Sequence, residues 1–214
     1  MRFYVLRNPQ TDQTDAVSDY IPDEDFKTGE APRCPVCGRA TGLRSWEPPY
    51  LVEMEFWGKY HGDIAFGTGD EFLVSERFKE IYQKTGLKGL YGFYPVEIFK
   101  VKPKRMAADI PNYYLAKIKY GSASVDIEAS GFEYDNYGYC NVCKEGGLLK
   151  RGRKVVIIQE TWIGDDIFNP KGLSGTIIAT QRFKDFCDSK SLKNIYLIEA
   201  EKYSFDFYPW EKDK

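Results

Sequence analysis

Two Cys-x-x-Cys pairs are the residues best suited to chemistry in this sequence of 214 residues. Cys34 and Cys37 form the first pair, which Gly38 follows, and Cys140 and Cys143 form the second. Two intervening residues let both sulfurs of a pair reach one metal ion, and a following glycine allows the backbone to turn sharply. Two such knuckles supply four thiolates, so we expect Cys34, Cys37, Cys140 and Cys143 to hold one zinc ion per chain.

Other interpretations of these cysteines are four thiols without a metal and two redox pairs. A redox motif of the thioredoxin type follows a strand and opens a helix, whereas both pairs stand in sequence typical of loops. A closed four-sulfur site has no open position for water, so the predicted zinc is structural. The fifth cysteine, Cys187, lies on the apolar stripe of an expected helix and should be a buried core thiol.

The sequence offers few residues for catalysis. His61 is its only histidine, it lies in a turn-like stretch, and no nucleophile motif accompanies it, so we expect a structural or solvent-exposed side chain. Six carboxylates are candidates for an acid–base pair, although a solvated face explains them better: Glu53, Glu55, Asp63, Asp70, Asp165 and Asp166. We therefore predict a protein that is not an enzyme.

Composition and charge favour a globular protein that does not bind nucleic acid. Hydrophobic residues make up 43% of the chain, with 16 Tyr and 14 Phe, which is enough to build a core. The 30 Lys and Arg are balanced by 32 Asp and Glu, whereas nucleic-acid binders carry a basic excess or patch. The short apolar start, Met1–Arg7, is not a signal peptide, and no stretch is apolar enough for a membrane span. We expect a cytoplasmic protein with reduced thiols.

An internal repeat organises the sequence. Leu73–Lys79 aligns with Ile178–Lys184, which places Arg77 and Arg182 105 positions apart. Equivalent spacings relate the two knuckles to each other and the following landmarks in pairs: Trp57 with Trp162, Asp63-Ile64 with Asp166-Ile167, and Leu87-Lys88 with Leu192-Lys193. We interpret this order as a duplication, and we expect the two tryptophans to occupy equivalent, largely buried positions.

Local patterns place helices and strands within the repeat. Ser75 and Thr180 stand where helix N-caps belong, before apolar residues at helical spacing, so helices are expected over Glu76–Thr85 and Gln181–Lys190. Most of the remaining ordered chain alternates in the manner of strands, as in Tyr114–Tyr120. Asn8–Pro32 holds seven acidic residues and few large aliphatics, which predicts a long acidic surface loop.

Several segments, taken together, resemble the bacterial double-CXXCG motif proteins over about residues 30 to 208. The matching segments are Cys34–Gly38, Leu73–Phe78, Phe93–Glu97, Cys140-x-x-Cys143, Trp162-x-Gly164-x-Asp166-x-Phe168, Arg182–Lys184 and Glu201-x-Tyr203-x-Phe205-Asp206. Lys144 departs from the pattern because it replaces the glycine of the second knuckle. Several members of that family are immunity proteins of toxin–immunity pairs, so the resemblance implies that this chain binds and neutralises a cognate protein toxin.

These observations predict an α+β fold of two related halves, residues 1–105 and 106–214, joined at the shared zinc site into one compact unit. The expected function is inhibition of a toxin by occlusion, with no catalytic residues and with contact residues that the sequence leaves open. The alternative is a zinc-ribbon protein with a nucleic-acid-binding or regulatory function. Salt-dependent retention on DNA or RNA would distinguish this alternative from a toxin inhibitor.

Overall fold

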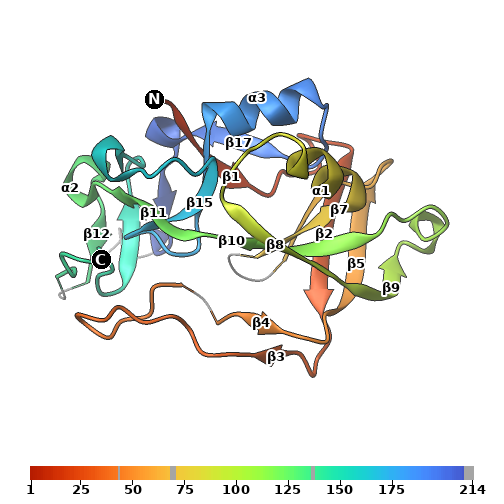
Figure 1. Ribbon diagram of the computed structural model, residues 1–214, viewed down its shortest axis with the longest axis horizontal. Helices are drawn as coiled ribbons and strands as arrows, with labels where there is room; N and C mark the ends of the chain where they lie inside the picture. The colour runs from red at the N-terminus through yellow and green to blue at the C-terminus, as the bar shows by residue number, and fades with distance from the viewer. Residues whose placement is uncertain (43, 68–70, 136–137, 210–214) are drawn as a thin grey trace.

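The computed structural model describes residues 1–42, 44–67, 71–135 and 138–209, and it confirms a mixed α+β fold dominated by strands (Figure 1). The seven-stranded sheet has the order β8 (Leu90–Pro95), β10 (Tyr113–Ile118), β7 (Phe72–Ser75), β6 (Ile64–Phe66), β2 (Ala16–Pro22), β5 (Leu51–Gly58) and β9 (Glu97–Lys102). The six-stranded sheet has the order β14 (Ile157–Ile158), β11 (Tyr120–Val125), β15 (Ile167–Lys171), β16 (Ile177–Thr180), β1 (Phe3–Arg7) and β17 (Tyr196–Glu199).

Smaller elements complete the fold. A three-stranded sheet joins β12 (Glu133–Tyr134), β13 (Leu149–Gly152) and β18 (Phe205–Asp206), and β3 (Lys27–Thr28) pairs with β4 (Trp46–Glu47). The helices are α1 (Glu76–Gln83), α2 (Ile127–Ser130) and α3 (Gln181–Ser189), with 3₁₀ turns η1 (Lys104–Met106), η2 (Gln159–Thr161) and η3 (Ala200–Lys202). Among the described residues no helix is both long and apolar enough to cross a membrane.

The two large sheets share a strand order and pairing directions. In the seven-stranded sheet, β7 leads into α1 and pairs antiparallel with β10 on one side and β6 on the other. In the six-stranded sheet, β16 leads into α3 and pairs antiparallel with β1 on one side and β15 on the other. Beyond these, β2 is parallel to β6 and antiparallel to β5, as β11 is parallel to β15 and antiparallel to β14. At the other edge, β8 and β17 pair antiparallel with β10 and β1. This correspondence supports the duplication, which remains our interpretation of the repeat.

The sheets exchange strands across the expected boundary between residues 105 and 106. β1, from the start of the chain, pairs with β16 and β17, whereas β10, from the second half, pairs with β7 and β8. Each sheet is therefore built from both halves of the sequence. The division into residues 1–105 and 106–214 stays a proposal about ancestry, and the strand exchange favours the expected single compact unit.

The two helices begin where their N-cap residues predict. The Ser75 hydroxyl accepts a hydrogen bond from the Phe78 amide at 3.1 Å, and the Thr180 hydroxyl accepts one from the Phe183 amide at 3.3 Å. Each cap satisfies an amide of the first turn that has no partner within the helix. The predicted helices are thus confirmed to within two residues at their C-terminal ends.

The central core lies between the two helices. Phe78 of α1 packs against Phe183 and Phe186 of α3, with ring centroids 6.4 and 5.9 Å apart. Cys187 lies in the same apolar cluster as Tyr82, and only 3% of its surface is exposed, which confirms it as a core thiol. Burial raises the pKa of the Cys187 thiol, so the group is inert as a nucleophile.

Two expectations about the first half are wrong. The acidic segment 8–32 is not a surface loop, because β2 runs through it and pairs with β5 and β6; Val17 and Tyr20 bury their side chains there. Trp57 is 42% exposed rather than buried, since it lies near the end of β5. Its counterpart Trp162 is partly buried, and its indole N–H donates to the Asp165 carbonyl at 2.7 Å.

Candidate metal centre

The structure brings together the four cysteines of the two knuckles. The Sγ atoms of Cys34, Cys37, Cys140 and Cys143 all lie within 4.8 Å of one another, and none of these cysteines forms a disulfide. The Cys37 and Cys143 sulfurs are 3.7 Å apart. An ion bound tetrahedrally at a metal–sulfur distance of about 2.3 Å separates its sulfur ligands by about 3.8 Å. The cluster therefore fits a single metal ion, and its all-sulfur donor set suits a soft or borderline ion.

The first knuckle lies at the far end of a long arm between β3 and β4 (Figure 1). The Gly38 amide donates to the Cys34 carbonyl at 2.9 Å, and the Cys34 amide donates to the Arg39 carbonyl at 2.8 Å. Gly38 has φ +73°, a left-handed conformation that closes this turn without a side-chain penalty. The turn aims both sulfurs of the knuckle at the same point.

The second knuckle repeats these hydrogen bonds. The Lys144 amide donates to the Cys140 carbonyl at 2.8 Å, and the Cys140 amide donates to the Glu145 carbonyl at 3.0 Å. Lys144 has φ +63°, so it adopts the left-handed conformation of Gly38 although it carries a side chain. The departure from the knuckle pattern thus leaves the turn intact and places strain at one residue.

Local electrostatics prepare part of the cluster for metal binding. The amides of Cys143 and Val142 lower the pKa of the Cys140 thiol to about 6, and those of Cys37 and Val36 lower the pKa of Cys34. Burial raises the pKa of the Cys143 thiol to about 12. The first cysteine of each knuckle thus ionises more easily than an ordinary thiol, whereas a buried thiol such as Cys143 needs a cation to hold its thiolate.

Glu145 fixes the second knuckle to the six-stranded sheet. Its carboxylate accepts hydrogen bonds from the Ser174 hydroxyl at 2.8 Å and the Gly172 amide at 3.1 Å. Burial raises the pKa of Glu145. The Glu145 carbonyl also accepts from the Arg39 guanidinium at 3.1 Å, which joins the two knuckles directly. The arm and the second half therefore meet through the sulfur cluster and this hydrogen bond.

His61 occupies a structural position. Its Nε2 lies 2.8 Å from the Met106 carbonyl, and its ring meets Phe56 edge-on, with the centroids 4.7 Å apart. These contacts use the imidazole for packing between β5 and the η1 turn. They agree with the expected structural role.

The expected solvated face of carboxylates is wrong for several of its members. Glu53, Asp63, Asp165 and Asp166 are buried; Asp70 lies outside the described residues. Asp63 accepts from the Ser75 hydroxyl and the Arg77 guanidinium, both at 2.8 Å. Asp166 accepts from the Thr180 hydroxyl at 3.1 Å and from Arg182 at 3.2 Å. The aligned Asp-Ile pairs were the sequence signal for these equivalent roles.

The family comparison agrees with the toxin-inhibitor expectation. No curated protein matches the chain. The family model of an immunity protein family, Imm11, matches residues 8–202, which includes both knuckles, both Asp-Ile pairs and both capped helices. This match confirms the immunity-protein part of the resemblance noted above and does not bear on the double-CXXCG name. Because the match spans nearly the whole sequence, the chain belongs to the Imm11 immunity protein family.

Proposed function

We propose that this protein binds a cognate bacterial toxin and neutralises it by occlusion, as a rigid body that covers a surface the toxin needs. The family match over residues 8–202 carries the proposal. The role requires no chemistry of its own, which agrees with the structural placement of His61 and the burial of Asp63 and Asp166 in capping and ion-pair contacts.

We further propose that Cys34, Cys37, Cys140 and Cys143 hold one structural zinc ion. Four sulfurs within 4.8 Å and two turns of the same geometry support this assignment. When bound, zinc would cross-link the arm to the second half and stiffen the scaffold. Stiffness lowers the conformational entropy that is lost when a protein binds its partner. The site would act in the cytoplasm, where thiols stay reduced.

Co-expression tests the immunity function. The toxin domain encoded by the open reading frame directly upstream should arrest growth when it is produced alone, and this protein should restore growth. The purified proteins should form a stable stoichiometric complex. A toxin that is neither bound nor neutralised would overturn the proposal.

The variant His61→Ala separates occlusion from catalysis. Under occlusion it keeps both protection and complex formation, since His61 contacts Met106 and Phe56 rather than a reacting group. If protection vanished while folding and binding stayed intact, the protein would be acting on the toxin as an enzyme.

A further inference from the structure

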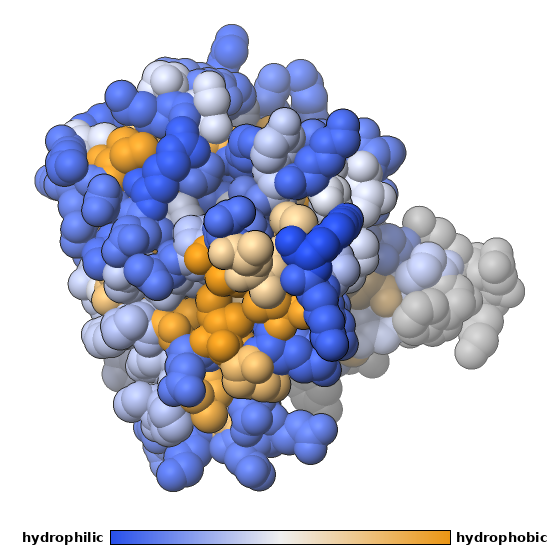
Figure 2. Space-filling view, turned by 90° about the vertical axis from the view of Figure 1, so that its right-hand side faces the viewer, coloured by the Kyte–Doolittle hydropathy of each residue, from blue (hydrophilic) through white to orange (hydrophobic). Residues whose placement is uncertain are grey.

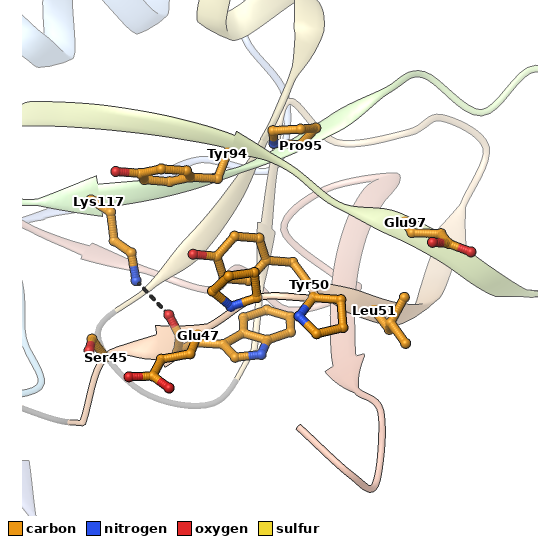
Figure 3. Close-up of a pocket in the computed structure, with 11 residues that line it drawn as sticks. Ser45, Glu47, Tyr50, Leu51, Tyr94, Pro95, Glu97 and Lys117 are labelled. Atoms are coloured by element: carbon orange, nitrogen blue, oxygen red, sulfur yellow. Dashed lines mark hydrogen bonds between the residues drawn. The ribbon is translucent and has the colours of Figure 1, made fainter. Parts of the chain in front are cut away.

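An aromatic groove lies at the corner where β4, β5, β8 and β9 meet. Its volume is 610 Å³, within the range of about 300–1,000 Å³ common for binding pockets. Figure 3 shows the Tyr94 ring beside the Tyr50 ring, with Glu47 and Glu97 at opposite ends of the lining. The lining residues come from the base of the arm, the start of β5 and the β8–β9 corner: Ser45–Leu51, Tyr94, Pro95, Glu97 and Lys117.

Three aromatic rings form the groove wall at steep angles to one another. The Trp46 and Tyr50 ring centroids are 5.2 Å apart with the planes at 82°, and Tyr50 and Tyr94 are 5.9 Å apart at 52°. Trp46 is buried, which fixes the wall, whereas Tyr94 is 42% exposed and available to a partner. Ring faces carry partial negative charge, so such an arrangement attracts cations.

The charges around the groove favour a cation as well. Exposed Glu47 and Glu97 belong to its lining, and within the part of the chain that the structure describes neither forms an ion pair. The lining cation, Lys117, is already neutralised by Glu71 and donates to the Trp46 carbonyl at 3.3 Å. Burial, followed by the nearby Glu71, raises the pKa of Tyr50. A purely apolar occupant would strip water from Glu47 and Glu97 without replacing it, which is unfavourable.

Apolar surface continues beyond the groove along β9. Figure 2 shows a patch of hydrophobic side chains on the side of the molecule where β5 and β9 lie. β9 begins with the groove residue Glu97 and carries half-exposed Phe99 together with partly buried Ile98 and Val101. Exposed apolar patches beside a polar rim mark protein-binding surfaces. The groove and β9 therefore offer a partner both an anchoring site and adjoining apolar area.

From this geometry we infer that the groove is the toxin-docking site and that it receives an arginine or lysine side chain from a basic segment of the toxin. This inference rests on the proposed immunity function and adds to it the binding surface and the chemistry of the partner. The cation meets the Tyr50 and Tyr94 rings and is attracted by the two carboxylates of the rim, Glu47 at one end of the groove and Glu97 at the other (Figure 3). The flanking apolar part of the segment covers β9.

Measured binding of the upstream-encoded toxin domain to immobilised variants tests the inference. Tyr94→Ala should weaken binding at least tenfold, mainly through faster dissociation, because it removes an aromatic anchor. The double variant Glu47→Gln/Glu97→Gln should weaken binding about tenfold, mainly through slower association, and should reduce its salt dependence. These side chains are exposed, so thermal unfolding of the variants should match that of the wild type.

Matched substitutions elsewhere serve as controls. Tyr196→Ala on β17 and the double variant Glu80→Gln/Glu201→Gln remove equally exposed side chains and should change the affinity less than twofold. If the wild type binds the toxin and the groove variants bind equally well, the docking site is wrong and the immunity function stands. If only Tyr94→Ala weakens binding, the groove receives an apolar side chain, and the inference of a cationic occupant is wrong. If the wild type does not bind the toxin at all, the proposed function fails and the docking site fails with it.

Discussion

Asp63 accepts a hydrogen bond from the backbone amide of Lys193 at 2.8 Å, although the two residues are 130 positions apart. Asp166 accepts the equivalent bond from the Lys88 amide at 3.0 Å. The arginine of each cluster also crosses over, since Arg77 donates to the Lys190 carbonyl and Arg182 to the Gly86 carbonyl. Each buried aspartate thus ties the start of its own helix to the loop that follows the other helix.

The substitution Asp63→Asn should destabilise the protein by about 2 kcal/mol, because it weakens charge-assisted hydrogen bonds in a buried site. Asp166→Asn should have a similar effect. Chemical denaturation followed by tryptophan fluorescence measures both. The control Asp188→Asn removes an exposed partner of Lys184 and should stay within about 0.5 kcal/mol of the wild type. Equal effects at Asp63 and Asp188 would show that the crossed contacts contribute little.

Elemental analysis should find one zinc ion per chain. Cys34→Ser should remove it and lower the unfolding temperature strongly, since the metal closes a loop of about a hundred residues and its binding energy adds to folding. Cys187→Ser should leave the zinc content unchanged and affect packing alone. Zinc well below one per chain after growth in metal-rich medium would contradict the assignment.

Lys144→Gly should stabilise the protein by about 0.5 kcal/mol. Glycine relieves the left-handed conformation at φ +63°, and the gain is reduced by the loss of a long cation–π contact with Tyr139. The matched change Gly38→Ala should destabilise the protein by about 1 kcal/mol, because alanine is strained at φ +73°. A steric clash would not contribute, since an added Cβ at this position meets nothing within 4 Å. The same direction of change in both variants would contradict the equivalence of the two turns.

The pH dependence of stability should reveal the ion pairs of Glu53. Hydrogen bonds from Lys100 and then Lys102 lower the pKa of this carboxyl in the folded protein. A lowered folded pKa contributes stability above the unfolded pKa, and that stability is lost as the pH falls through the folded value. The difference in unfolding free energy between the wild type and Glu53→Gln should therefore be largest near neutral pH and shrink below about pH 4. A difference that did not change with pH would contradict this role of the two ion pairs.

Local signals were sufficient to predict the helices, the buried Cys187 and the paired knuckles. Ser75 and Thr180 cap helices through atoms three residues away, so a short stretch of sequence contains the whole interaction. The strand β2 escaped prediction because its partners, β5 and β6, lie far along the chain, and because the acidic residues in and around it obscure the buried Val17 and Tyr20.

Burial of Asp63 and assembly of the aromatic groove depend on contacts that no local pattern contains. The loop that covers Asp63 belongs to the other half of the sequence. Trp46 and Tyr50 lie four residues apart, but Tyr94 comes from β8, and only the folded sheet places its ring beside theirs. The count of 16 tyrosines in the sequence carries no information about which of them meet in the fold.

Loss of the metal should loosen the arm before it affects the sheets. Among the described residues of the arm, the contacts at the knuckle end include the mutual approach of the four sulfurs and the hydrogen bond from Arg39 to Glu145, so zinc would supply most of the cross-link there. Cys37 is exposed, and Cys37→Ser should therefore remove the metal with little disturbance of packing. Hydrogen exchange followed by mass spectrometry should show faster exchange in peptides that cover residues 30–42. Peptides from β2 and β5 should stay protected, because their pairing is independent of the knuckles. Faster exchange throughout the protein would instead mean that the metal supports the entire fold, and unchanged exchange in the arm would mean that its other contacts suffice to hold it.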